Sequence, residues 1–491
     1  MSVVEGDPFS FLGSAAVNPA EIVRPTSVEE VQAAVRAAAA SGTPLWTVSR
    51  GKNLGYGGAA PRVPGSTLLD LSGMDRILEV DDESGYCVVE PGVTFLALDE
   101  HLRATGSRLM PSVPDIGWGS VIGNALERGF GYTPHGDHSA YMCGLEVVLA
   151  DGTLLRTGMG AFPDSSAWAL YKGGYGPSLD GLFVQSNLGI VTKMGVWLMP
   201  RPETISVCQI GAPSDDDLAP LIDTLRPLLL DGTIQSNVVI GNAPVIASMV
   251  SPRAAWWTGA GPMPAAAVDR ITAALGIGRW NARCAFYGPP ALVAARLDVL
   301  RGAVSAFDLK VTTYPGDVDP ADVHPADRAQ LGIPSTDLIR MAEWRGGTPA
   351  HTDFSLVCPP TGRDAVRQKE LIERKVEAHG FDYAGGFTLN PRHAIALALV
   401  SFDRDDPAEA AAVAALFPEL IADAAAAGYA PYRAHVAYMD LIADRYDAYD
   451  SAHRHTVERI KDALDPAGVL SPGKQGVWPA GHRSTRGAVP R

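Results

Sequence analysis

The sequence predicts an α+β protein with two domains, and three observations lead to this prediction. Short apolar stretches, separated by Pro, Gly and Asp turns, have the pattern of strands. Amphipathic stretches with helical spacing stand between them throughout the chain. The length of 491 residues exceeds what one hydrophobic core usually serves. The Pro200-Arg-Pro-Glu203 segment breaks the pattern and is the predicted domain boundary.

The first half of the chain begins with a predicted helix that starts after Ser27 and ends near Gly42. Ser27 and Glu30 have the spacing of a capping box, and apolar residues recur at helical intervals behind them. The elements expected next, in chain order, are strands at 45–48, 67–71 and 86–90, a helix at 95–104, and strands at 144–149 and 189–198.

The second half repeats the mixture of elements with longer helices. Helices are predicted at 215–230, 265–275 and 291–307, between apolar strands. A long alanine-rich amphipathic helix is predicted at 408–427. This part therefore reads as a second α+β unit.

Composition and charge exclude several classes of protein. A net charge of −15 argues against binding to nucleic acid or to an anionic membrane, because both need clustered Lys and Arg. No apolar run approaches membrane-spanning length. The acidic N-terminus lacks the features of a signal peptide, and five scattered cysteines without metal-ligand spacing read as buried thiols. We therefore expect a cytoplasmic protein without a metal site.

The most informative motif is Ser49-Arg-Gly-Lys-Asn-Leu-Gly-Tyr-Gly-Gly58, which follows an apolar strand. Its glycines allow successive backbone N–H groups to turn towards an anion. Asn53 replaces the Ser or Thr of a P-loop, and the spacing is not that of a dinucleotide fingerprint. A glycine-rich turn alone is more often only a turn, so the motif gains meaning from the segments that follow.

Further glycine-rich and aromatic segments occur in a fixed order along the chain. They are residues 114–138, 186–200, Gly278-Arg-Trp-Asn281, Tyr287-Gly-Pro289, 432–440 and Gly473–Trp478. Together with the glycine-rich loop they resemble the vanillyl-alcohol oxidase and p-cresol methylhydroxylase family of FAD enzymes, most of all its 4-phenol oxidases such as vanillyl-alcohol oxidase and eugenol oxidase. The resemblance implies an FAD-binding domain at 1–203, a cap domain over the flavin at 204–429, and a return to the FAD-binding domain at 430–491.

The resemblance also implies which residues hold FAD. They come from the glycine-rich loop, from the long segment after Pro114, from the strand at 189–198 and from the C-terminal segments. The set is Arg50, Gly51, Lys52, Asn53, Leu54, Gly55, Pro114, Gly117, Gly119, Ser120, Gly123, Asn124, Gly131, Tyr132, Gly136, Asp137, Gly189, Ile190, Val191, His351, Arg433 and Lys474.

Three residues at family positions would bind a phenol as its phenolate: Tyr56, Tyr432 and Arg433. Taken singly, each has an ordinary interpretation as a packed aromatic or a surface cation. Together they make chemical sense, because phenol hydroxyls and a guanidinium stabilise one oxyanion and lower its pKa.

A catalytic carboxylate and a substrate pocket are also implied by the resemblance. Asp115 would lie beside the reactive flavin nitrogen, although an Asp before glycines often only starts a turn. A carboxylate there stabilises developing positive charge and activates water. Tyr132, Asp353 and Leu397 are the predicted pocket residues. Asp353 departs from the family, since the fungal enzyme has a bulky aromatic residue at that position.

His351 aligns with the histidine that is bonded to the flavin 8α carbon in the oxidase branch. A lone histidine is more often an ordinary hydrogen-bonded residue. The chain has no histidine before His101, so the N-terminal helper histidine of vanillyl-alcohol oxidase is missing. Where relatives often carry paired histidines, this chain has Ile395-Ala396. We nonetheless predict covalent FAD through His351.

The expected activity is oxidation of 4-substituted phenols. A hydride would leave the benzylic carbon for flavin N5 and give a p-quinone methide, and O2 would take the electrons to form hydrogen peroxide. Two alternatives stay open: a cytochrome-linked dehydrogenase of the same fold, and a flavin-binding protein without turnover. A homo-oligomer, dimeric or larger, is also expected from the resemblance.

Overall fold

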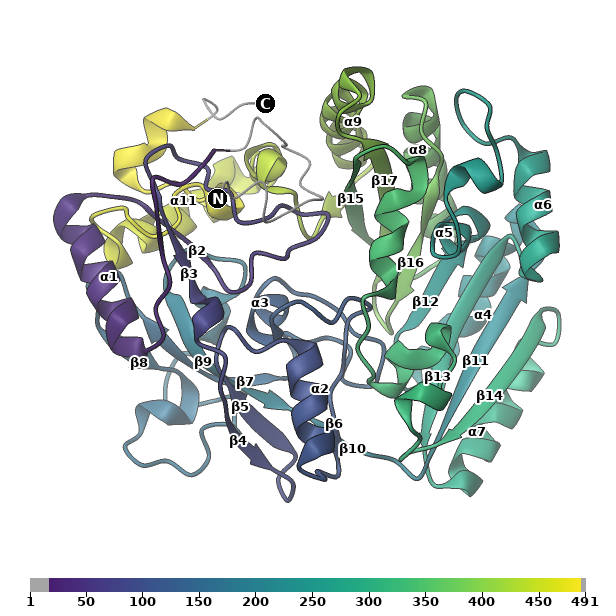
Figure 1. Cartoon of the computed structure of the whole chain (residues 1–491), viewed down its shortest axis with the longest axis horizontal. Helices are drawn as coiled ribbons and strands as arrows, with labels where there is room; N and C mark the ends of the chain where they lie inside the picture. Colours follow the sequence, from purple (N-terminus) through teal and green to yellow (C-terminus); the bar gives the residue numbers. More distant parts are fainter. Residues whose placement is uncertain (1–16, 487–491) are drawn as a thin grey trace.

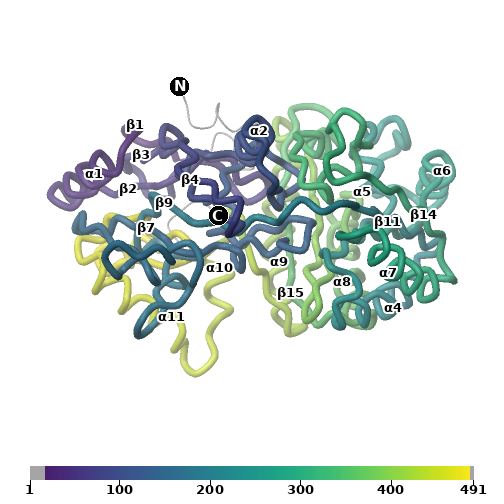
Figure 2. The backbone as a smooth tube through the Cα atoms, turned by 90° about the horizontal axis from the view of Figure 1, so that it is seen from below, coloured from purple at the N-terminus to yellow at the C-terminus, as the bar shows by residue number. Residues whose placement is uncertain are grey.

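The computed structural model describes residues 17–486, so the N-terminal segment used for the localisation prediction lies outside it. Two lobes lie side by side in Figures 1 and 2. One lobe combines N-terminal elements, in purple and blue, with C-terminal elements in yellow, and the other contains the middle of the chain in teal and green. The predicted α+β class is confirmed.

The first lobe is built on two sheets. The smaller is a parallel sheet of order β1-β3-β2, and the larger is an antiparallel sheet of order β4-β5-β9-β7-β8. A further strand pair joins β10 to β6. The strands are β1 (Glu21–Val23), β2 (Leu45–Val48), β3 (Thr67–Asp70), β4 (Ile77–Asp81), β5 (Tyr86–Val89), β6 (Leu109–Met110), β7 (Met142–Val148), β8 (Leu154–Arg156), β9 (Ile190–Trp197) and β10 (Met199–Pro200); the helices are α1 (Val28–Ser41), α2 (Phe95–Ala104) and α3 (Val121–Leu126).

Helix α1 shows why local signals predicted its ends well. The Ser27 hydroxyl accepts a hydrogen bond from the Glu30 N–H at 3.2 Å, and Gly42 closes the helix with a left-handed φ of 71°. The other half of the capping box differs from the prediction. The Glu30 carboxylate accepts from the Thr26 N–H at 2.7 Å, one residue before the expected partner.

The second lobe is an eight-stranded sheet of order β14-β11-β13-β12-β16-β17-β15-β18. Helices α4, α7, α8 and α9 pack on one face and enclose the largest hydrophobic core. The elements are β11 (Thr204–Ala212), β12 (Val238–Asn242), β13 (Trp280–Gly288), β14 (Asp308–Pro315), β15 (Pro349–Cys358), β16 (Ala384–Leu389), β17 (Ala394–Asp403), β18 (Ala430–Pro431), α4 (Leu218–Leu230), α5 (Ala243–Ser248), α6 (Ala265–Leu275), α7 (Pro290–Ala303), α8 (Gly362–Ala378) and α9 (Pro407–Ala426).

The chain then returns to the first lobe through α10 (Met439–Ala443) and α11 (Ala448–Leu464). Leu470 forms a bridge with Leu45 of β2, and the buried Arg62 forms an ion pair with Asp440 at 2.7 Å. The eight-stranded sheet itself runs from Thr204 to Pro431, so the exact domain limits of 203 and 429 stay predictions.

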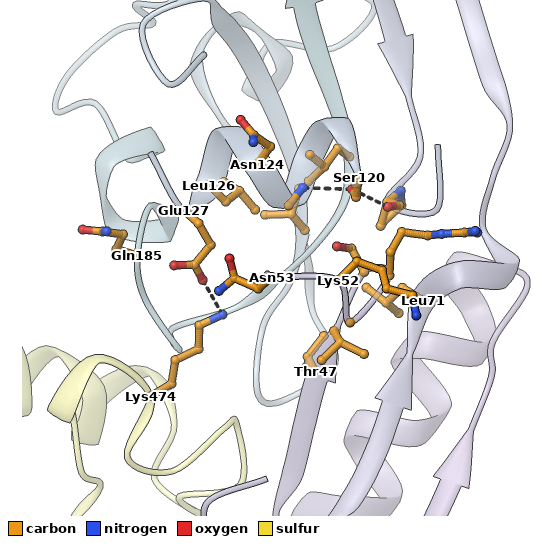
Figure 3. A pocket seen from close by; sticks show the side chains of 18 of the residues that line it. Thr47, Lys52, Asn53, Leu71, Ser120, Asn124, Leu126, Glu127, Gln185 and Lys474 are labelled. Carbon is orange, nitrogen blue, oxygen red and sulfur yellow. Dashed lines mark hydrogen bonds and ion pairs between the residues drawn. The ribbon is translucent and has the colours of Figure 1, made fainter. Parts of the chain in front are cut away.

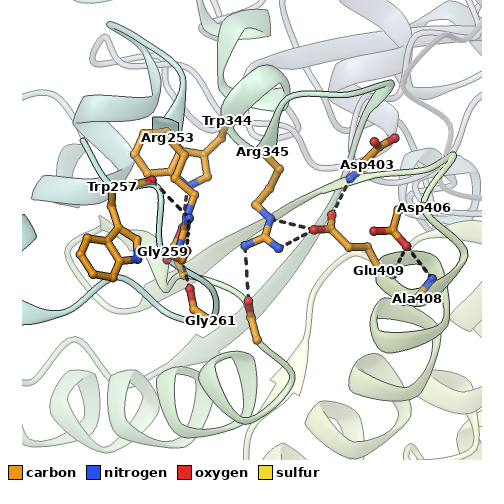
Figure 4. A network of polar contacts seen from close by, with 12 residues as sticks. Arg253, Trp257, Gly259, Gly261, Trp344, Arg345, Asp403, Asp406, Ala408 and Glu409 are labelled. Atoms are coloured by element: carbon orange, nitrogen blue, oxygen red, sulfur yellow. Dashed lines mark hydrogen bonds and ion pairs between the residues drawn. The ribbon is translucent and has the colours of Figure 1, made fainter. Parts of the chain in front are cut away.

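A polar network in the second lobe holds the start of β15 (Figure 4). Arg345 pairs with Glu409, whose carboxylate also accepts the Asp403 N–H at 2.7 Å. Asp403 in turn accepts the Thr348 N–H at 3.0 Å, immediately before β15. A second cluster holds Arg253 against Asp382 at 2.6 Å. The first of these networks fixes the strand end that carries His351.

All five cysteines are buried and unpaired. In the part of the chain that the structure describes, no helix combines the length and the apolar character needed to cross a bilayer. No group of three or more potential side-chain ligands for a metal ion occurs among residues 17–486.

Candidate active site

Strand β15 organises the candidate site because its two faces have different roles. Ala350, Phe354, Leu356 and Cys358 belong to the hydrophobic core of the second lobe. Side chains alternate between faces along a strand, so His351, Asp353 and Ser355 share the opposite face. Leu397 of β17 lies directly opposite Ser355 and therefore shares that face.

The glycine-rich loop lies along the part of the β15 edge that β18 leaves unpaired. The Asp353 N–H donates to the Gly55 carbonyl at 3.1 Å, and the Thr352 hydroxyl donates to the same oxygen at 3.2 Å. Gly55 has a φ of +78°, and a Cβ there would lie 2.2 Å from an oxygen of the Asp353 carboxylate. Only glycine allows this close approach, which brings Tyr56 to the strand.

The segment after β18 reaches the same edge. The Tyr432 N–H donates to the Ser355 carbonyl at 3.3 Å, and the Val436 N–H donates to the Tyr56 carbonyl at 3.1 Å. The Arg433 guanidinium lies over the Tyr56 ring, 4.1 Å from its centre. Three segments that are distant in sequence thus bring Tyr56, Tyr432 and Arg433 together.

The Tyr56 hydroxyl is oriented and stays protonated. It lies 2.8 Å from the Ser355 Oγ. Burial, and then the neighbouring Tyr432 and Asp353, raise the pKa of Tyr56 well above its usual value, against the effect of Arg433. A protonated phenol beside a guanidinium is a hydrogen-bond donor suited to an oxyanion.

Asp115 lies in a second part of the site. Burial raises the pKa of its carboxyl group, while a hydrogen bond from the Tyr132 hydroxyl and the nearby Arg283 oppose that effect. Burial, and then the neighbouring Asp115 and Tyr432, raise the pKa of Tyr132 well above its usual value. The carboxylate and the phenol-binding residues therefore border one region.

His351 is buried and neutral. Burial lowers the pKa of its imidazole to about 4, and its Nδ1 has no hydrogen-bond partner among the described residues. Its Nε2 lies 4.0 Å from the Asp353 carboxylate. A neutral imidazole keeps one nitrogen lone pair available, which is the requirement for a covalent bond to carbon.

A cavity whose lining includes Arg433 lies beside the glycine-rich loop (Figure 3). Of the residues predicted to hold FAD, the lining includes Arg50, Gly51, Lys52, Asn53, Gly119, Ser120, Gly123, Asn124, Gly189, Ile190, Val191, Arg433 and Lys474. Lys474 and Glu127 form an ion pair of 2.7 Å in its wall.

The donors in this cavity fit FAD. Gly51 has a left-handed φ of +62°, and the N–H groups of Gly51 and Asn53 make no backbone hydrogen bond within residues 17–486. Thr47 Oγ1 and Arg433 Nε are buried without a partner in the same described part. A ligand with a central pyrophosphate and a polar ring would satisfy such donors.

Other predicted FAD contacts lie outside the cavity lining: Leu54, Gly55, Pro114, Gly117, Gly131, Tyr132, Gly136, Asp137 and His351. Some of them have structural roles. Gly131 donates to the Gly136 carbonyl at 2.8 Å in a tight turn, and Gly117 donates to the Ser335 carbonyl at 2.7 Å across the lobes. Their contacts with FAD stay predictions.

The sequence interpretation missed several residues of this region. Gln185, Phe183, Val436 and Met439 line the cavity, and Ser355 contacts Tyr56. Ser355 had a usable signal, because it follows His351 and Asp353 at the strand interval of two. The cavity residues had none, since they come together only through packing.

Comparisons with known proteins identify the family of this chain. Residues 19–158 match a family described as an FAD binding domain, and residues 346–475 match the C-terminal domain of FAD linked oxidases. The 4-cresol dehydrogenase [hydroxylating] flavoprotein subunit of Pseudomonas putida is 35% identical over 94% of this chain and 89% of its own. The chain belongs to the vanillyl-alcohol oxidase and p-cresol methylhydroxylase family. It is thus a member of a family of FAD-dependent oxidoreductases.

Solved structures show the same relationship. A 4-ethylphenol oxidase from Gulosibacter chungangensis, in complex with isoeugenol, has a TM-score of 0.93 and 38% identity over 98% of this chain and 94% of its own. P-cresol methylhydroxylase with substrate bound has a TM-score of 0.91 and 34% identity, covering 97% and 92%. The 1'-carboxy-chondrochloren decarboxylase of Chondromyces crocatus is 33% identical over 92% of this chain and 90% of its own, so family members carry out different reactions.

Proposed function

We propose that this protein is an FAD-dependent oxidase of 4-substituted phenols, including 4-hydroxybenzyl alcohols and 4-alkyl or 4-allyl phenols. The observation that carries the proposal is the position of Arg433, 4.1 Å from the Tyr56 ring beside a cavity that fits FAD. Binding of FAD alone does not require the guanidinium of Arg433 and the phenol groups of Tyr56 and Tyr432 to lie together. The substrates named for the 4-cresol dehydrogenase subunit and the 4-ethylphenol oxidase support the same class.

In this proposal Tyr56, Tyr432 and Arg433 bind the substrate as its phenolate. The cation and the two hydroxyl donors lower the pKa of the bound phenol and place its oxygen. The negative oxygen pushes electron density into the ring, which favours loss of a hydride from the para benzylic carbon. Binding energy at the remote oxygen thereby lowers the barrier at the reacting carbon.

Bound FAD would supply the hydride acceptor at N5 and transfer the electrons to O2, giving hydrogen peroxide. Asp115 would stabilise the positive charge that develops on the benzylic carbon, and it would take a proton from water that adds there. With a benzylic alcohol, loss of the hydroxyl proton would give an aldehyde instead. Tyr132, through its hydrogen bond, would keep the Asp115 carboxylate in place.

His351 would bind the flavin covalently, and this supports an oxidase. In the family that the sequence resembles, oxidases attach the flavin through a histidine at this position, while cytochrome-linked members attach it through a tyrosine. The neutral, buried imidazole of His351 has the nucleophilic form that the attachment needs.

A second candidate is a dehydrogenase that passes its electrons to a cytochrome. The similarity to the 4-cresol dehydrogenase subunit favours it. The test is a screen of para-substituted phenols with detection of peroxide and oxygen uptake in the absence of an added acceptor. Flavin bleaching by a phenol under anaerobic conditions, with no peroxide in air and turnover restored by a cytochrome, would support the dehydrogenase. No bleaching by any para-substituted phenol would contradict both.

A further inference from the structure

Asp353 places a carboxyl group beside the residues that, in the proposed function, bind the substrate as an anion. Its side chain retains 22% exposure, so a small molecule can reach the carboxylate. It lies on the same face of β15 as His351 and Ser355, two residues from each, which is about 7 Å along a strand in either direction. Asp353 therefore stands between the predicted flavin attachment point and the serine that contacts Tyr56.

The contacts of Asp353 join it to the phenol-binding residues. Its N–H is bonded to the Gly55 carbonyl, which immediately precedes Tyr56. After burial and Tyr432, the charge of Asp353 contributes to the raised pKa of Tyr56. Against the effect of burial, the Arg433 cation lowers the pKa of Asp353. The loop that carries Tyr56 and the residue that carries the carboxylate are thus joined in one unit, and the Arg433 charge acts on both.

Charge balance gives this unit a chemical role. Without substrate, the Arg433 cation favours an ionised Asp353 carboxylate, and the two charges sum to zero. A phenolate added to that pair would leave an excess negative charge in an enclosed site, which is costly. A neutral phenol adds no charge, and movement of its proton within the site leaves the total unchanged.

We propose that Asp353 receives the proton that the phenol loses on binding, and this inference rests on the proposed function. The O–H bond of the phenol breaks, its electron pair stays on the phenol oxygen, and the proton bonds to a carboxylate oxygen of Asp353. The step involves no oxidation. Arg433 then pairs with the new phenolate, and the site keeps its net charge.

The other titratable groups around Asp353 do not compete for this proton near neutral pH. The imidazole of His351, on the same strand, has a pKa lowered to about 4 by burial. Tyr56, from the glycine-rich loop, stays protonated, and Arg433 is a permanent cation. Burial raises the pKa of Asp353 itself to about 7, against the effect of Arg433. Its carboxylate is therefore available above that pH and already protonated below it.

The test counts protons when the holoenzyme binds 4-fluorophenol, which has no benzylic hydrogen and a pKa of about 10, like tyrosine. Calorimetry in two buffers of different ionisation enthalpy gives the number of protons released on binding. Ultraviolet difference absorbance shows that the ligand is bound as phenolate. At about pH 8 the unmodified enzyme should release close to no proton, because Asp353 accepts it. At about pH 6 it should release close to one.

Asp353→Asn should release about one proton at both pH values, because the amide cannot accept it. Asp353→Glu should restore the low count at the higher pH. Ser355→Ala is the control, since it removes the partner of the Tyr56 hydroxyl but keeps the Asp353 carboxyl group. The number of protons that this variant releases should follow that of the unmodified enzyme. If Asp353→Asn does not fold, the pH dependence of the unmodified enzyme alone is sufficient.

Release of one proton at both pH values by the unmodified enzyme, with phenolate bound, would overturn the inference. Equal counts for Asp353→Asn and the unmodified enzyme at the higher pH would overturn it as well. Flavin reduction by an oxidisable phenol in the same preparation would show that the proposed function survives either result. Absence of both phenol binding and flavin reduction would instead contradict the proposed function.

Discussion

Arg433 lies over Tyr56, with its guanidinium carbon 4.1 Å from the ring centre, although the two residues come from opposite ends of the chain. Arg433 also donates to the Asn53 side chain. Both contacts join the C-terminal segment to the glycine-rich loop beside the cavity. The arrangement allows specific tests of which groups bind substrate and which bind cofactor.

Replacing Arg433 with Ala removes the cation of the proposed phenolate site. Loss of a charge-assisted hydrogen bond costs roughly 1.5–3 kcal/mol, or about one to two orders of magnitude in kcat/KM. The pH optimum should also move upward, because the bound phenol then ionises at higher pH. Steady-state rates between acid and alkaline pH measure both effects. Arg433→Lys, which keeps the charge, should be less impaired; an unchanged pH profile in Arg433→Ala would contradict the role.

Replacing Ser355 with Ala removes the partner that orients the Tyr56 hydroxyl at 2.8 Å. A neutral hydrogen bond contributes about 0.5–1.5 kcal/mol, so the affinity for 4-fluorophenol should fall by roughly 2- to 10-fold. Ser206→Ala is a matched control, because Ser206 makes a hydroxyl contact of the same 2.8 Å length with Thr313 in the same sheet. Equal affinities in the two variants would argue against a positioning role for Ser355.

His351 should carry the flavin covalently. Acid-precipitated protein should stay yellow, and a peptide that contains residue 351 should have the added mass of FAD. His351→Ala should keep FAD without a covalent bond, because the glycine-rich loop is intact, and its hydride-transfer step should slow. Since the N-terminal helper histidine is missing, attachment should be slow. Complete release of FAD from the denatured unmodified protein, after long incubation with excess cofactor, would rule out the bond.

Gly55 and Gly65 form a matched pair for the docking of the glycine-rich loop. Both have left-handed backbones, with φ of +78° and +80°, but a Cβ on Gly65 would meet no atom within 4 Å. Gly65→Ala should therefore cost only about 1–2 kcal/mol of backbone strain. Gly55→Ala should lose about 1–3 kcal/mol more, because its methyl group would collide with Asp353. Denaturant unfolding measures the difference; equal losses would show that the loop does not press on Asp353.

Asp115→Asn should slow the reaction without weakening phenol binding. Removing a proton-transfer group typically costs about 10²- to 10⁴-fold in rate. The amide keeps the shape of the side chain and its contact with Tyr132 while it loses the charge. Rapid-reaction measurement of flavin reduction, beside the dissociation constant of 4-fluorophenol, separates the two effects. A slower step accompanied by an equal loss of affinity would instead indicate a disturbed pocket.

The α+β class, the family and many element limits followed from the sequence alone. The strand at 45–48 and the helix at 95–104 have the predicted bounds, and α1 begins and ends at its predicted caps. These features depend on hydrogen bonds and side-chain periods that span only a few residues, so the local sequence contains the necessary information. Even there, the Glu30 carboxylate accepts from the Thr26 N–H, one residue before its predicted partner.

Only the tertiary structure decided how the site is assembled. The core beneath β15 sets which side chains face outward, and this places Ser355 beside Tyr56 and Asp353 beside Gly55. The edge of β15 beyond its short pairing with β18 then receives two segments that are remote from it in sequence. Such contacts depend on the packing of whole elements and not on local preference. No pattern in the chain predicted the cavity-lining Gln185. The spacing from His351 and Asp353 marked the strand face of Ser355, but its contact with Tyr56 came only from packing.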